Sequence, residues 1–217
     1  MSDHRQSGPI SFRDYERLSG VITATLQGTE YEAKTSCFFY ALVGAYILDK
    51  KHGLEAKFRA GAAAYLVDET KGKGHVISYG NTLLSSETEN FLDIEGDHFH
   101  CWIECEGFAI DLMAPLFPQV ISEPIPRRMF QRPLSESCHN YLELKQPGDF
   151  HLVPYDDFGM KLLEMFEENQ GGHSIVDICN SWYRPSPAQI ETQIRVASSA
   201  RETRTLRLPS YKLKGQW

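Results

Sequence analysis

The spacing of apolar residues changes at Gly53, and this change limits the fold of the 217-residue chain more than any other feature. Before Gly53, apolar residues recur at helical spacing over residues 12–27 and over the very apolar residues 36–52. After it, short apolar segments typical of strands are separated by clusters of Gly, Asn, Ser and Glu. These segments are residues 55–67, 75–80, 99–105 and 108–114. Helices followed by strands predict an α+β fold with a central antiparallel sheet.

The second half of the chain begins with a proline-rich connection over residues 115–128, which predicts irregular structure. Residues 140–145 then have the composition of a strand. Beyond them the apolar residues recur at helical spacing, and Ser186 followed by Pro187 is a typical helix start. The sequence therefore predicts three C-terminal helices, over residues 155–172, 173–183 and 186–196.

The chain has the length and composition of one folded domain. Hydrophobic residues make up 41% of it and charged residues 24%, which is enough apolar content for one core and argues against extensive disorder. We expect residues 1–10 to be flexible and residues 11–217 to form a single α+β domain, because no linker interrupts them. The sequence does not predict an oligomeric state.

Charge and cysteine content argue against several classes of partner. The net charge of −7 argues against nucleic acids and acidic membranes, although residues 184–217 alone carry seven Lys or Arg and two Glu. The longest apolar run, residues 38–48, has eleven residues and is too short to span a bilayer. Because the five cysteines are an odd number and no apolar signal region follows Met1, we expect a cytoplasmic protein with free thiols.

Cys37 lies in the first turn of the most apolar predicted helix. The unpaired N–H groups and the positive end of the helix dipole favour a thiolate at that position, and they can also hold an oxyanion. None of the other four cysteines has this setting in the sequence. A small buried cysteine of the core would occupy the same position, so this feature alone does not decide between a nucleophile and a packing residue.

Residues 97–115 predict a β-hairpin with polar residues on one face. Side chains alternate across a strand, so His100, Trp102 and Glu104 share a face. With a two-residue turn at 106–107, Trp102 opposes Asp111, which then lies diagonal to His100. That diagonal permits a carboxylate–imidazole hydrogen bond, whereas a one-residue change of the loop would turn Asp111 to the other face.

Cys37, His100 and Asp111 are the three parts of thiol-based acyl transfer: a nucleophile, a base that moves its proton, and a carboxylate that orients the base. Their order and local sequence resemble the transglutaminase-like, arylamine N-acetyltransferase-like branch of the papain-like cysteine proteinase fold. In transglutaminases a helix-initial Cys precedes a strand with H-x-W-x-E, matched here by His100, Trp102 and Glu104, and an Asp lies on the next strand. The chain also resembles an uncharacterised bacterial family, a domain of unknown function assigned to this fold.

The resemblance covers residues 30–115 and implies a papain-like fold with its nucleophile at a helix start. It implies a cysteine-dependent hydrolase or acyltransferase without a cofactor, acting on a small-molecule or peptide amide or on a thioester. Hydrolysis and acyl transfer both stay open, because the same residues serve a water or an amine acceptor. Trp102 and Glu104 would shape the substrate site, and His98 is either a substrate-facing neighbour or an exposed polar residue.

Two other functions stay open. His98, His100 and Glu104 share a strand face and, together with His151, resemble the metal-binding motifs of cupins, which would suit Fe, Mn, Ni or Zn. The helical segments and the absence of the framing glycines disfavour this metal site, because a cupin is an all-β double sheet. The third hypothesis is a non-catalytic binding module.

Overall fold

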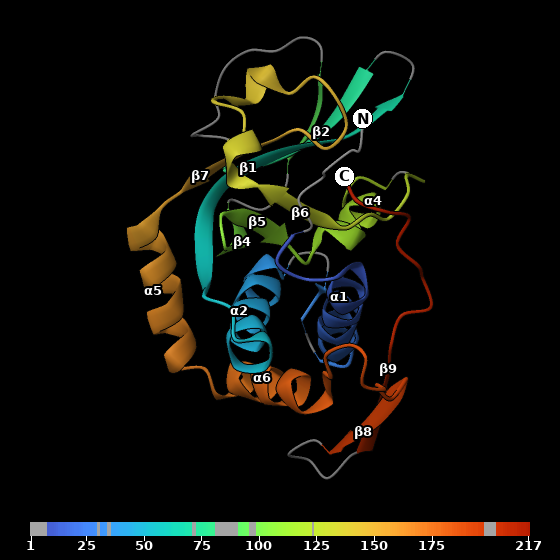
Figure 1. Ribbon diagram of the computed structural model, residues 1–217. Coiled ribbons are helices and arrows are strands. Elements are labelled where there is room, and N and C mark those ends of the chain that lie inside the picture. Colours follow the sequence, from blue (N-terminus) through green and yellow to red (C-terminus); the bar gives the residue numbers. More distant parts are fainter. Residues whose placement is uncertain are drawn as a thin grey trace.

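The structure is a computed structural model, and it describes eight ranges of the chain. They are residues 8–29, 31–33, 36–70, 73–80, 91–95, 99–122, 124–197 and 203–217. The fold is mixed α+β, with a curled sheet and several helices (Figure 1). None of the described helices is long and apolar enough to cross a membrane.

The described helices and strands alternate in blocks along the chain. The α-helices are α1 (Phe12–Gln27), α2 (Cys37–Ile47), α4 (Phe117–Val120), α5 (Asp156–Glu167) and α6 (Gln170–Trp182). A π-helical turn, Leu48–His52, extends α2, and 3-10 turns cover Ala114–Leu116, Leu134–Glu136 and Tyr141–Glu143. The strands are β1 (Ala56–Thr70), β2 (Lys73–Tyr79), β3 (Phe91–Glu95), β4 (His100–Cys105), β5 (Phe108–Asp111), β6 (Phe130–Pro133), β7 (Phe150–Pro154), β8 (Gln193–Ala197) and β9 (Thr203–Arg207).

The long strand β1 organises the sheet. Gly61 pairs with His100 of β4 and also with Pro154 of β7, so β4 and β7 lie on opposite edges of β1. Residues 63–65 pair with both β2 and β7, so β2 lies on the same edge as β4 and follows it along β1. Gly61 is required at this crossing, because a Cβ there would lie 2.0 Å from the carbonyl oxygen of Val153.

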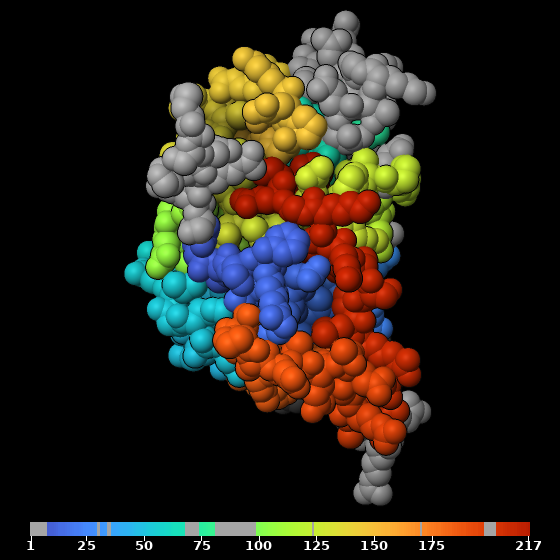
Figure 2. Space-filling view, turned by 45° about the vertical axis from the view of Figure 1, so that its right-hand side comes forward, coloured from blue at the N-terminus to red at the C-terminus, as the bar shows by residue number. Residues whose placement is uncertain are grey.

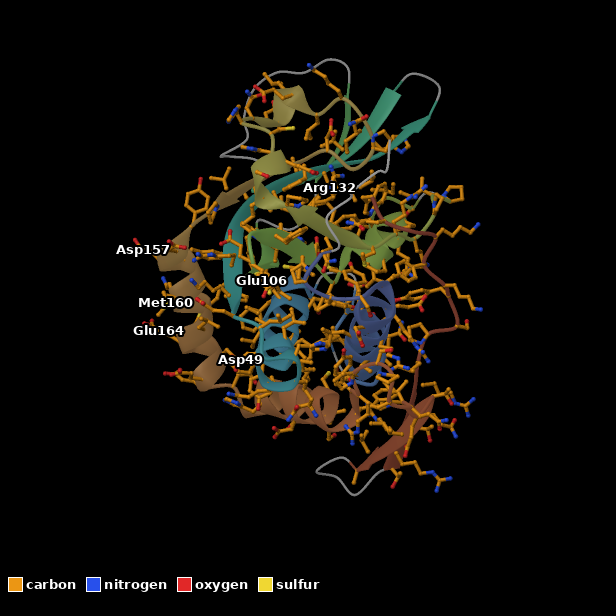
Figure 3. The ribbon with its side chains drawn as sticks, in the orientation of Figure 1. Asp49, Glu106, Arg132, Asp157, Met160 and Glu164 are labelled. Atoms are coloured by element: carbon orange, nitrogen blue, oxygen red, sulfur yellow. The ribbon has the colours of Figure 1, made fainter. Side chains whose placement is uncertain are left out.

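The helices pack on the face of the sheet that carries the main core. Figure 1 shows α1 and α2 beside each other below the sheet, with α6 across their ends and α5 along the outer side of β1. The chain enters α5 directly from β7, where the Tyr155 N–H donates to the Ala60 carbonyl at 2.9 Å. The outward side of α5 is exposed, as the labelled Asp157, Met160 and Glu164 show in Figure 3.

Local sequence explains how the two N-terminal helices begin and end. Ser11 caps α1, because its Oγ accepts from the Asp14 N–H at 3.1 Å and donates to the Asp14 carboxylate at 2.6 Å. Gly53 ends the α2 extension in the left-handed conformation, with φ of 67°. The helices predicted over 12–27 and 36–52 are therefore confirmed, and so are the strands predicted in the first half of the chain.

Two predictions in the second half are wrong. Residues 140–145, predicted as a strand, contain the 3-10 turn Tyr141–Glu143, which the Asn140 side chain caps. Residues 186–196, predicted as a helix, instead lead into β8 and include four of its five residues, because half-buried Ile194 and Val196 alternate with exposed polar residues. The sheet is also not wholly antiparallel, since β2 and β3 pair in parallel.

Both ends of the described chain pack against the body. Ile10 is buried, and its backbone N–H and C=O bind the Gln131 side chain, whereas residues 1–7 of the segment predicted to be flexible lie outside the described residues. The C-terminal segment runs over α1, as Figure 2 shows in red against blue. There the Leu213 N–H donates to the Glu16 carboxylate at 3.1 Å.

Candidate active site

Cys37 is the first residue of α2, where a helix leaves its first N–H groups without intrahelical partners. Its side chain is 3% exposed and points toward the start of β4, with Sγ 4.0 Å from the Phe99 carbonyl oxygen. α2 packs against β4 and β1, so the helix start is held over the strand that carries His100. The sequence prediction placed the thiol at this helix start, and the structure has it there.

The hairpin β4–β5 brings His100 and Asp111 together. Its two-residue turn is Glu106–Gly107, with positive φ at both residues, and Cys105 pairs with Phe108 as the sequence predicts. His100 Nε2 lies 2.8 Å from Asp111 Oδ2, and both side chains are buried. The register inferred from the sequence therefore gives the contact that it predicted.

The Asp111 carboxylate is fixed on both of its oxygens. Oδ2 accepts from the imidazole, and Oδ1 accepts from the Met113 N–H at 2.9 Å. The Asp111 backbone is held by α1, because its carbonyl accepts from the Tyr15 hydroxyl. Such a carboxylate holds the imidazole with its proton on Nε2 or with both nitrogens protonated, and it leaves Nδ1 as the reactive nitrogen.

The electrostatics of the site favour a thiolate and an imidazolium. The pKa of Cys37 is lowered to about 6 by hydrogen bonds from Cys101 and His100 and by the His100 charge, which together outweigh burial. Burial lowers the pKa of His100, but the charge and hydrogen bond of Asp111, together with Cys37, raise it to about 10. His100 Nδ1 is buried and makes no hydrogen bond of good geometry with the described residues.

The other four cysteines have the opposite character. Burial raises the pKa of Cys101, of Cys138, of Cys105 to about 11 and of Cys179 to about 12. All five cysteines are described, and Cys37 alone has a lowered pKa. The helix start and the imidazole thus single out one thiol as the nucleophile candidate.

Aromatic rings surround His100, and the sequence did not reveal them. The Tyr79 ring stacks on the imidazole, with centroids 4.4 Å apart and an interplanar angle of 20°. The Tyr65 ring meets it edge-on at 5.6 Å, and Phe117 lies at 6.5 Å. Both tyrosines belong to predicted strands, but nothing local in the sequence places them beside His100.

The chain matches the model of a family described as "Protein of unknown function (DUF2026)" over residues 11–217. The chain belongs to this family. The crystal structure of "genomics APC5867" is similar to it over 98% of both chains, with a TM-score of 0.79 and 27% identity. No curated protein matches the chain.

Of the two further residues that the transglutaminase-like resemblance singled out, Glu104 is bound by Arg59 and Trp102 is part of the buried core in this DUF2026 structure. Glu104 binds Arg59 at 2.8 Å, and Arg59 also binds Asp156 at 2.9 Å. Glu104 follows His100 by four residues in one strand, a separation of about 13 Å. Trp102 is buried in the core, where its Nε1 makes no hydrogen bond with the described residues. His98 lies outside the described residues.

The set of residues for the cupin-like metal site does not converge in the described part of the DUF2026 chain. Among these residues, no three His, Cys, Asp or Glu side chains lie close enough to hold a metal ion. Glu104 is bound to Arg59, and His151 donates from Nδ1 to the Cys138 carbonyl at 2.7 Å. His98, the remaining member of that set, is not among the described residues.

Proposed function

We propose that this DUF2026 protein is a cysteine-dependent hydrolase or acyltransferase of amides or thioesters. Cys37 is the nucleophile, His100 the general base and acid, and Asp111 the group that orients and charges the imidazole. The observation that carries the proposal is the one acidic thiol of the chain, held at a helix start beside an imidazole that a buried carboxylate binds. The substrate is a small-molecule or peptide amide, or a thioester.

The reaction proceeds through an acyl-enzyme. Cys37 Sγ attacks the substrate carbonyl carbon, and the N–H groups at the start of α2 stabilise the oxyanion. The carbon–nitrogen or carbon–sulfur bond then breaks, and the imidazolium of His100 gives its proton to the leaving group. A water or an amine, deprotonated by His100, then attacks the acyl-enzyme thioester, and the acyl group leaves Cys37 as a thiolate beside the regenerated imidazolium.

The order of the elements supports placing the chain in the transglutaminase-like branch of the papain-like fold. The helix that begins with Cys37 precedes the His100 strand, and the Asp111 strand follows directly.

A metal-dependent reaction at His98, His100, Glu104 and His151 has less support, because Glu104 and His151 are bound elsewhere. A reducing compartment such as the cytoplasm would keep Cys37 a free thiol.

The burial of the thiol sets a condition on catalysis. Since the Cys37 side chain is 3% exposed, a substrate reaches Sγ only after neighbouring groups move. The surroundings of the thiol are nevertheless titratable rather than wholly aliphatic, because Cys101 and His100 both lie close enough to lower the pKa of Cys37. We therefore expect small acyl donors to react faster than bulky ones.

Trapping of the acyl-enzyme tests the proposal. The protein is incubated with a panel of activated amides, esters and thioesters, and the intact mass is measured after rapid acid quenching. We expect one acyl adduct, absent from Cys37→Ser and retained in the matched Cys179→Ser variant, whose thiol is buried and has a raised pKa. An adduct that survives in Cys37→Ser contradicts the assignment, and so does a wild-type Cys37 that titrates like an ordinary thiol and forms no adduct.

A further inference from the structure

Among the described residues, the imidazole of His100 binds Asp111 through Nε2 and stacks on the Tyr79 ring. The bond to Asp111 holds Nε2, but the ring can still rock about its Cβ–Cγ bond, a pivot that bends this hydrogen bond and swings Nδ1 out of line. The Tyr79 ring, nearly parallel to the imidazole at 4.4 Å, blocks this pivot on one face. Tyr65 packs its edge against the same imidazole, so the two tyrosines define the plane in which Nδ1 lies.

We propose that Tyr79 is the positioning residue of the candidate thiol site: its ring holds the His100 imidazole in plane and stabilises its charged form against Cys37. The inference rests on the proposed function, because it assigns Tyr79 a role in that site. Tyr79 acts through His100, and no contact with the substrate is required of it. Tyr65 supports the same ring from its edge.

The small residues of β1 explain how these rings meet. Gly61 pairs with His100 of β4, and Ala63 pairs with Tyr79 of β2. Because β4 and β2 follow each other on one edge of β1, the two rings come from positions two residues apart along that strand, about 7 Å. Gly61 and Ala63 share one face of β1 and are small, so they leave the space on that face to the two rings.

The face of an aromatic ring binds a charged imidazolium more strongly than a neutral imidazole. The negative face of the Tyr79 π-system attracts an imidazolium, and the attraction is strongest where water is excluded, as at this buried site. The groups that face His100 are Asp111 from β5, Cys37 from α2, Tyr65 from β1 and Tyr79 from β2. Asp111 and Cys37 supply the opposite charge, and Tyr79 adds to their effect while fixing the direction of Nδ1.

The test compares Tyr79→Leu, which removes the ring, with Tyr79→Phe, which keeps it. The readout is the pH midpoint of the Cys37 thiolate, from its ultraviolet absorbance in each protein minus that of the same protein carrying Cys37→Ala. We expect the wild-type midpoint at about 6, the same midpoint in Tyr79→Phe, and a rise of about one pH unit in Tyr79→Leu. Phe117→Leu, which alters a buried ring that is not stacked on the imidazole, is the matched control and keeps the wild-type midpoint.

A second readout keeps the proposal testable if Tyr79→Leu unfolds. In the wild type, ring current from Tyr79 shifts the His100 ring protons upfield in the NMR spectrum, and Tyr79→Phe retains this shift. An ordinary wild-type thiol midpoint near 9 overturns the proposed function itself. A low wild-type midpoint that Tyr79→Leu leaves unchanged overturns only the role of Tyr79, as does a Tyr79→Phe variant that behaves like Tyr79→Leu, or a wild type without the upfield shift.

Discussion

Replacement of Asp111 by Asn tests the electrostatic chain from carboxylate to imidazole to thiol. The substitution keeps the size and shape of the side chain and removes its charge. In the structure this charge lies 2.8 Å from His100 Nε2, with both groups buried, so solvent screens it little. Because the Asp111 charge raises the pKa of His100, we expect its loss to lower that pKa and to weaken the imidazolium that holds the Cys37 thiolate.

The size of the effect follows from the kind of hydrogen bond that is lost. A hydrogen bond to a charged group contributes about 1.5–3 kcal/mol, and about 1.4 kcal/mol corresponds to one pKa unit. The thiolate midpoint of Cys37 in Asp111→Asn should therefore rise by about one to two units from its value of about 6.

The assay is a pH titration of the ultraviolet absorbance of the thiolate, corrected with the corresponding Cys37→Ala protein. Circular dichroism shows whether Asp111→Asn stays folded, since Asp111 also accepts a hydrogen bond from the Met113 N–H. A folded Asp111→Asn protein whose Cys37 midpoint equals that of the wild type would refute the argument that the carboxylate acts on the thiol through His100.

Three further predictions concern packing, pH and the role of Glu104. In denaturant titration, Gly61→Ala should lower the free energy of unfolding by about 1–3 kcal/mol, because the added Cβ would meet a carbonyl oxygen of β7. The control Gly171→Ala in α6 should not lower the free energy of unfolding. The pKa of Cys37 is lower in the folded protein than in the unfolded chain, so the thiolate stabilises the fold above the unfolded pKa, and this stabilisation is lost as pH falls through about 6. The difference in unfolding free energy between wild type and Cys37→Ala should therefore rise with pH across this window. A difference that does not change with pH would contradict the shift. Glu104→Gln should leave the Cys37 titration unchanged, since Glu104 pairs with Arg59; a shifted midpoint would return Glu104 to the site.

Local patterns in the sequence predicted the central contact of the candidate site. A two-residue turn and the alternation of side chains were enough to place Asp111 beside His100, because hairpin register depends only on neighbouring residues. The position of Cys37 followed from the start of a very apolar helix. The prediction that these two parts meet came from their complementary chemistry and from a family resemblance, since no local pattern sets the packing of α2 on β4.

Long-range pairing explains what the sequence did not reveal. Tyr79 reaches His100 only because β2 follows β4 along one edge of β1. Glu104 lies on the same face of its strand as His100, as expected of a site residue, but Arg59 from the neighbouring strand binds it. In the C-terminal part, the helix-start signal at Ser186–Pro187 is not followed by a helix, because the residues around Ile194 alternate and pair with the distant strand β9.

Competitive alkylation of the five cysteines tests most directly whether Cys37 is an activated nucleophile. At a pH of about 6, half of the Cys37 side chains are thiolates, whereas a thiol of ordinary or raised pKa, such as the more exposed Cys138, has at most about one in three hundred ionised. We predict that limiting iodoacetamide modifies Cys37 first, by peptide mass mapping, and that His100→Ala abolishes this preference. Labelling of Cys37 no faster than Cys138, or labelling that His100→Ala leaves unchanged, would contradict the account.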